Sequence, residues 1–244
     1  MDIETKHKNT KSYFSEFPKW TIGAILVGLF ACAAGGGGIA IGLLLIAGGA
    51  WGIYSSFGNK PSDQQMDEWL DEDIKALQQK ALAKTGTDES ELVGESVSVF
   101  GPRLWEVGGA EVKFKKGNDN VLRYSPVGVS VISFTQNQIV TYQCVFDRFT
   151  GNSINEATDE YFYKDVVSVS TKTDSMNVTS EKLGGALHLK TAESFTLTTS
   201  GGTSLSVFLR DPALIEKMGG GELPVTRAEK ALQSVRKMLR EKKA

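Results

Sequence analysis

Charged residues are missing from the stretch between Trp20 and Phe57, which contains no Asp, Glu, Lys or Arg. The rest of the chain carries 27 Lys and Arg and 29 Asp and Glu, a formal net charge of −2. This near balance excludes a strongly basic protein whose surface neutralises many nucleic-acid phosphates. We therefore expect no nucleic-acid partner, and the uncharged stretch needs its own explanation.

Cysteine and histidine are scarce, with Cys32 and Cys144, and His7 and His188, as the only representatives. Cys32 lies in the uncharged stretch and Cys144 in a strand-like run, so we expect both to be reduced and structural. The chain also lacks zinc-ligand spacing, a phosphate-loop motif and a Gly-x-Ser-x-Gly motif. These absences predict a protein that is not an enzyme, without catalytic, cofactor-binding or metal-binding residues and without a cofactor.

The uncharged stretch is too long for one straight helix across a membrane. As a continuous helix it would extend about 57 Å, against a hydrocarbon core of about 30 Å. Glycines are the residues at which a helix is most easily interrupted, and four of them lie near the centre. The pattern predicts a glycine-rich transmembrane hairpin over residues 18–57, with helices Pro18–Ala34 and Ile39–Phe57. A single crossing is the alternative, and the predicted turn is formed by Gly35, Gly36, Gly37 and Gly38.

Aromatic and basic residues flank the predicted hairpin at its two ends. Tryptophan, tyrosine and phenylalanine there are typical of a membrane interface, and an excess of lysine marks the cytoplasmic side. We therefore predict that the N-terminal tail, residues 1–17, and the C-terminal domain are cytoplasmic, at the cell inner (plasma) membrane. The predicted interfacial anchors are Phe14, Phe17, Trp20, Trp51, Tyr54 and Phe57, and the flanking lysines are Lys6, Lys8, Lys11, Lys19 and Lys60.

In the remaining chain the spacing of the apolar residues changes twice. Residues 58–94 are predicted to form an acidic helix, Ser62–Lys84, and a linker, since apolar residues recur at helical spacing. Residues 95–244 alternate with the period of strands and end in an amphipathic helix from Thr226. Predicted strands are Ser96–Phe100, Ala110–Lys115, Val121–Tyr124, Val127–Phe134, Ile139–Asp147, Tyr161–Ser170, Ala186–Lys190, Ser194–Thr199 and Ser204–Leu209.

Two polar segments of this domain, Thr150–Glu160 and Lys172–Lys182, are predicted to be its longest loops. The last helix is basic, and bases near an anionic surface contribute about 1 kcal/mol each. Contact with lipid headgroups is therefore one interpretation, against a packed helix whose charges face water. The residues concerned are Arg236, Lys237, Arg240, Lys242 and Lys243.

The run Tyr163–Val169, the hairpin between Ser194 and Leu209 and the final helix resemble a bacterial pleckstrin-homology-like domain in the order of their elements. This resemblance implies a small antiparallel barrel or sandwich that serves as a binding or assembly module. The expected fold class is thus a membrane-anchored α+β protein. It consists of a transmembrane hairpin, a connecting helix and a mainly antiparallel β domain closed by a C-terminal amphipathic helix.

The expected function is that of a non-catalytic membrane-anchored scaffold, a subunit of an inner-membrane assembly. Its partners would be membrane lipids and a protein bound by the β domain. A second copy of the chain, in a homo-oligomer, is a further candidate partner. The alternative hypothesis is a pore-forming or membrane-perturbing protein. In that case the glycine-rich hairpin is the active element and the C-terminal domain regulates it.

Overall fold

The computed structural model describes the chain except residues 1, 17, 58–59, 226 and 244, and except the side chains of residues 55–57 and 243. Its contacts divide the chain into two compact units, Met1–Ser62 and Asp63–Ala244.

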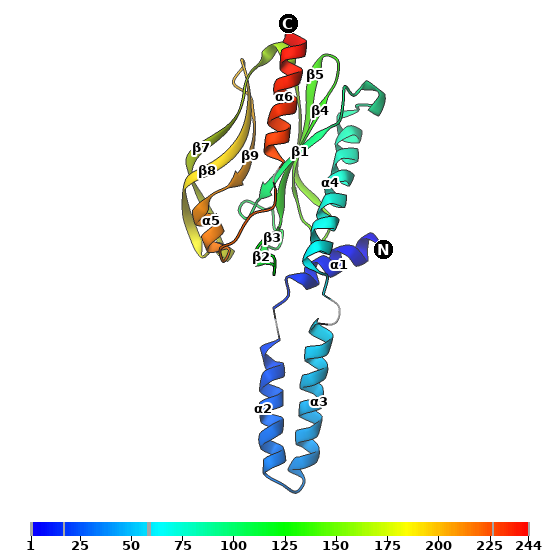
Figure 1. The fold of residues 1–244 in the computed structure, drawn as a ribbon, viewed down its shortest axis with the longest axis vertical. Helices are drawn as coiled ribbons and strands as arrows, with labels where there is room; N and C mark the ends of the chain where they lie inside the picture. The colour runs from blue at the N-terminus through cyan, green and yellow to red at the C-terminus, as the bar shows by residue number, and fades with distance from the viewer. Residues whose placement is uncertain (1, 17, 58–59, 226, 244) are drawn as a thin grey trace. The chain divides into compact units, whose positions relative to one another are not determined.

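The first unit consists of helices α1 (Ile3–Tyr13), α2 (Lys19–Ala33) and α3 (Gly38–Phe57). The predicted N-terminal tail is therefore helical over most of its length. Helices α2 and α3 lie side by side as an antiparallel hairpin (Figure 1). Glycines allow this close approach: a Cβ atom added at Gly28 would lie 2.7 Å from the carbonyl oxygen of Gly42. Small residues at a helix interface let two backbones approach in this way.

The structure contradicts the predicted transmembrane hairpin. Among the described residues, none of the helices combines enough length with enough apolar character to span a bilayer. Helix α2 has 15 residues, which corresponds to about 22 Å against the roughly 30 Å of a hydrocarbon core. The expected helix Pro18–Ala34 is shortened at both ends. The predictions of a membrane-anchored fold and of an inner (plasma) membrane location depended on those spans, so they are wrong for the same reason.

The second unit begins with helix α4 (Asp63–Thr85) and continues into antiparallel strands. Helices α5 (Pro212–Lys217) and α6 (Ala228–Lys243) follow the last strand. The strands are β1 (Val97–Pro102), β2 (Lys113–Lys116), β3 (Leu122–Ser125), β4 (Val127–Phe134), β5 (Gln138–Phe146), β6 (Ser153–Phe162), β7 (Val166–Ser180), β8 (Gly185–Thr199) and β9 (Ser204–Arg210). Short 3-10 helices cover Glu89–Glu91, Tyr163–Asp165 and Glu181–Leu183. The α+β class with antiparallel sheets is thus confirmed.

The strands form a four-stranded sheet in the order β1-β4-β5-β6, a three-stranded sheet in the order β7-β8-β9, and the pair β2-β3. Within the larger sheet Val97 pairs with Ile132 and Val127 with Phe146. Strands β1 and β6 are therefore its edges. Whether this arrangement belongs to the pleckstrin-homology-like domains stays a prediction.

The four-stranded sheet is covered on both faces. On one face, Ile74 and Leu77 of α4 pack with Phe100, Val131 and other residues of the sheet. On the opposite face, Val97 and Val99 pack with strands β8 and β9 and with Ala231 and Val235 of α6. The apolar stripes predicted for the acidic helix and for the last helix are therefore the surfaces that cover the sheet.

Both segments predicted as long loops are strands. Strand β6 occupies most of Thr150–Glu160, and β7 continues through Lys172 to Ser180. Six consecutive residues of β6, from Asn155 to Glu160, are exposed. An edge strand with solvent on both faces has no alternation of apolar and polar residues, so its sequence resembles a loop. The two strands predicted between Ala186 and Thr199 are a single strand, β8.

Candidate functional site

The predicted glycine turn connects α2 to α3. Helix α2 ends at Ala33 and α3 begins at Gly38, so Gly35, Gly36 and Gly37 lie between the helices. Gly35 and Gly36 have φ angles of 74° and 58°, which are unfavourable for residues with a Cβ atom. Gly38 instead belongs to the helix and packs closely on Ala31. The turn therefore depends on two of the four glycines.

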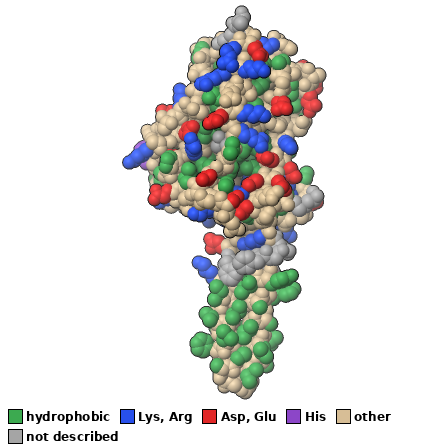
Figure 2. Space-filling model, in the orientation of Figure 1, with side chains coloured by type: hydrophobic (Ala, Val, Ile, Leu, Met, Phe, Trp, Pro, Cys, Tyr) green, Lys and Arg blue, Asp and Glu red, His purple; other side chains and the backbone are tan. Residues whose placement is uncertain are grey.

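The surface of the hairpin is apolar on both helices. Phe30 on α2 is 79% exposed and Leu44 on α3 is 75% exposed. Figure 2 shows hydrophobic side chains, in green, over the hairpin. A helix that is apolar all round is normally buried by a partner. Exposed large apolar residues of the hairpin are Trp20, Ile22, Leu26, Val27, Leu29, Phe30, Ile39, Ile41, Leu43, Leu44, Trp51 and Tyr54.

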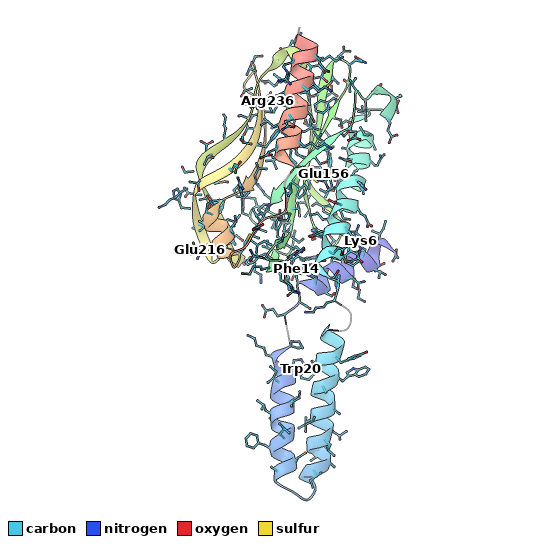
Figure 3. The ribbon with its side chains drawn as sticks, viewed as in Figure 1. Lys6, Phe14, Trp20, Glu156, Glu216 and Arg236 are labelled. Carbon is cyan, nitrogen blue, oxygen red and sulfur yellow. The ribbon has the colours of Figure 1, made fainter. Side chains whose placement is uncertain are left out.

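The predicted aromatic anchors differ in their exposure to solvent. Trp20 is exposed at the end of the hairpin opposite the glycine turn (Figure 3). Trp51 and Tyr54 are exposed in the last turns of α3, and their rings lie 6.2 Å apart. Phe14 follows α1 and is buried, with its ring 5.2 Å from that of Tyr13. Phe17 and the side chain of Phe57 lie outside the described residues.

The basic residues predicted for lipid headgroups lie on α6. Arg236 and Lys237 are exposed, and Arg236 donates a 3.5 Å hydrogen bond to the carbonyl of Val169 (Figure 3). Lys242 donates to the side chain of Gln136 at 2.6 Å. Arg240 is exposed, and the side chain of Lys243 is not described. Two of these bases thus have contacts within the β-rich unit.

A groove of about 500 Å³ lies along the outer edge of β1. Helix α4 supplies Lys75, Gln78 and Gln79 as one wall, and the start of α6 supplies Lys230 with the preceding Arg227 as the other. Residues Ser96, Val97 and Ser98 line the groove between these walls. Figure 1 shows β1 between α4 and α6. We call this cavity the β1 groove.

Two buried arginines attach the first turns of α4 to the sheet, and the sequence analysis did not identify them. Arg123 forms a two-bond contact with Asp67, with distances of 2.9 and 2.6 Å, and a second with Asp119. Arg148 donates to the carbonyl of Met66 at 2.7 Å. Burial lowers the pKa of Arg148. The only sequence signal for this contact was the position of Arg123 inside a predicted strand. Its partner carboxylate, that of Asp67, is distant in sequence.

Cys144 and Tyr142 lie on β5 beneath Lys80 of α4. Burial raises the pKa of the Cys144 thiol and of the Tyr142 hydroxyl. A nucleophilic cysteine requires the opposite shift, toward the thiolate. Lys80 is bonded to Glu156 at 2.7 Å, and this bond lowers the pKa of Glu156. The arrangement holds α4 against the sheet.

Among the residues that the structure describes, no group of three or more His, Cys, Asp or Glu side chains could hold a metal ion. The chain matches no known family model, no curated protein and no solved structure. The hairpin surface and the β1 groove are therefore the two candidate functional surfaces of the described residues.

Proposed function

We propose that this chain is a non-catalytic association protein. Its apolar hairpin packs against the hairpin of a second copy, and its β-rich unit binds a partner protein. The single observation that carries this proposal is the exposure of large apolar side chains on both helices of the hairpin. Removal of apolar surface from water contributes about 25 cal/mol per Å², from which the entropy lost on association is subtracted.

A second copy suits this surface for two reasons. The stretch Trp20–Phe57 has no charged residue, so two identical surfaces meet without repulsion between like charges. In addition, a Cβ atom added at Gly23 or Gly48 would have no atom within 4 Å, which leaves room for close approach from outside. Two hairpins that pack in this way form a four-helix bundle, a geometry in which apolar faces are buried together.

Cross-linking tests the proposal. In a chain with Cys32→Ala and Cys144→Ala, the substitution Leu44→Cys places a thiol on the exposed face of α3. We expect mild oxidation of the purified protein to produce a covalent dimer of the full-length chain, whereas Ser204→Cys on the β-rich unit remains monomeric.

A charge on the same face should separate the copies. We expect Phe30→Lys to lower the mass measured by light scattering from that of a dimer or larger oligomer to that of one chain. Val225→Lys is the matched control, because Val225 is an apolar residue of the other unit that is 84% exposed, and its mass should equal the wild type. A wild-type chain that is monomeric and floats with phosphatidylcholine vesicles would contradict the proposal, since lipid would then cover the hairpin.

A further inference from the structure

Strand β1 has a neighbour on one side only, β4, within the four-stranded sheet. An edge strand presents N–H and C=O groups that another extended chain can pair with. Two main-chain hydrogen bonds at the end of β4 show which of its residues face β1 and which face β5. The N–H of Val93 donates to the carbonyl of Phe134, and the N–H of Thr135 donates to the carbonyl of Gln138.

Main-chain groups of successive residues in an antiparallel strand point alternately to either neighbour. The even-numbered residues of β4 therefore face β1, and its odd-numbered residues face β5. Since Val97 pairs with Ile132 and Val99 with Ser130, the main-chain groups of Val97 and Val99 face β4. Those of Ser96, Ser98 and Phe100 face the other way, and for Ser96 and Ser98 this is toward the β1 groove.

A side chain of α4 already occupies part of this edge. The Nε2 atom of Gln78 donates to the carbonyl of Ser96 at 3.3 Å and to the hydroxyl of Ser98 at 3.0 Å. The first bond stands where the N–H of an added strand would stand. The carbonyl of Ser96 is half-buried, and a carbonyl held partly away from water needs a donor, so the amide of Gln78 substitutes for a missing strand.

The walls of the β1 groove decide what fits there. Helices α4 and α6 lie on opposite sides of the groove. They prevent the edge of a second folded sheet from reaching β1, whereas a single extended chain can enter. From Ser96 to Ser98 the floor extends about 7 Å at 3.3 Å per residue, which accommodates pairing with a few residues.

Charge specifies the side chains of the bound segment. Lys75 lies on the α4 wall and Lys230 on the α6 wall. Lys230 is 3.7 Å from Glu95, with both side chains mostly exposed, a contact of small energy. Glu89 accepts a hydrogen bond from Gln79 at 3.0 Å, and Arg227 is paired with Asp71 at 2.6 Å. The lining thus holds three cations, Lys75, Arg227 and Lys230, against two carboxylates, Glu89 and Glu95, and this excess of positive charge favours carboxylates on the bound chain.

We propose that the β1 groove binds an extended acidic segment of a partner protein by strand addition to β1. The segment pairs its main chain with Ser96 and Ser98, displaces the amide of Gln78 and directs carboxylates to Lys75 and Lys230. This inference rests on the proposed role of the β-rich unit as a partner-binding module, and it defines the chemistry of that partner.

Fluorescence anisotropy tests it with the full-length chain in mild detergent. The probe is a fluorescein-labelled peptide of alternating aspartate and valine, compared with a peptide of alternating lysine and valine. We expect saturable binding of the acidic peptide and binding at least about tenfold weaker of the basic peptide.

Ser98→Pro removes an N–H that faces the groove and leaves the ladder to β4 intact, since proline is tolerated at such an edge position. We expect about tenfold weaker binding of the acidic peptide. Ser98→Ala keeps the N–H and removes only the hydroxyl that accepts from Gln78, so it should bind no more weakly than the wild type. Circular dichroism verifies that both variants are folded.

Lys75→Glu supplies an independent measurement if Ser98→Pro fails to fold. It should weaken binding of the acidic peptide about tenfold and favour the basic one, whereas Lys217→Glu on α5 should change neither. Absence of saturable binding, equal affinity for both peptides, or unchanged binding to folded Ser98→Pro would overturn the inference. None of these substitutions lies in the hairpin, so the cross-linking of copies reports separately on the proposed function.

Discussion

Arg123 is nearly inaccessible to solvent and bonds to carboxylates from two directions, Asp67 on α4 and Asp119 just before its own strand. Bidentate contacts between guanidinium and carboxylate are strong and directional. Removing one partner of a buried pair costs more than the pair contributes, because a charge remains without compensation. Arg123 therefore determines where the first turns of α4 lie on the sheet.

This contact predicts a dependence of stability on pH. The hydrogen bond from Arg123 lowers the pKa of Asp119 from 3.8 to about 2. A carboxyl whose pKa is lower in the folded state stabilises that state above the unfolded pKa, and the contribution disappears as pH falls through the folded pKa. We therefore expect Asp119→Asn to reduce the free energy of unfolding at neutral pH. The difference from the wild type should shrink between pH 3.8 and about 2.

Urea unfolding at a series of pH values measures this difference. Asp119 is partly exposed, so solvent screening keeps the effect small. A constant difference between the two proteins across the whole pH range would show that the contact with Arg123 does not depend on the charge of Asp119.

At the scale of elements, the spacing between α2 and α3 depends on Gly42. A Cβ atom added there would collide with the carbonyl oxygen of Gly28 and lie 2.9 Å from the main-chain nitrogen of residue 32, contacts that remain when Cys32 is replaced. We expect Gly42→Leu to separate the helices at a cost of about 1–3 kcal/mol. Gly48→Leu is the matched control, since nothing lies within 4 Å of a Cβ atom at Gly48.

Spin labels at Val27→Cys and Leu44→Cys, in chains without Cys32 and Cys144 and diluted with unlabelled protein, measure this separation. The distance should increase or broaden in Gly42→Leu and remain as in the parent in Gly48→Leu. Identical distances in all three proteins would mean that the glycine contact does not control helix spacing.

Helix α4 is stabilised by its apolar stripe on the sheet. Ile74 is completely buried in that contact. We expect Ile74→Ala to lower the free energy of unfolding by about 2–5 kcal/mol, since the truncation leaves a cavity. Ala83→Ser lies on the exposed side of the same helix and should change stability by less than about 0.5 kcal/mol. Guanidinium unfolding followed by tryptophan fluorescence measures both effects. Equal effects of the two substitutions would mean that α4 is only loosely attached to the sheet.

At the scale of the whole molecule, the two units differ in what stabilises them. Both buried apolar clusters of the β-rich unit consist of residues between Leu70 and Leu239. The second unit, Asp63–Ala244, thus contains its own hydrophobic core. The hairpin instead leaves its apolar residues at the surface.

We therefore expect the fragment Asp63–Ala244 to fold without the first unit. Its melting temperature should lie within about 5 °C of the transition assigned to this unit in the full-length chain, a shift that corresponds to about 1 kcal/mol. Calorimetry measures both transitions, and light scattering should show the fragment as a monomer. A fragment that is unfolded would mean that the first unit contributes to the core.

Some features of this protein follow from the sequence alone, because they depend on neighbours along the chain. The uncharged stretch and its interruption at Gly35 and Gly36 are such features, as are the apolar stripe of α4 and the alternation in β5. Here the local pattern of residues matches the period of the element that forms. The pattern did not determine how many residues of α2 are helical. The predicted membrane span was wrong because α2 is too short for it.

The tertiary structure alone decided the rest. Strand β6 is a strand because it pairs with β5, although its own residues show no alternation, and Arg123 meets Asp67 across 56 positions of sequence. The β1 groove exists because α4 and α6, from opposite ends of the unit, cover opposite faces of one sheet and leave its edge between them. Such contacts depend on which distant segments share a core, and a periodic pattern in one segment carries no information about its partner.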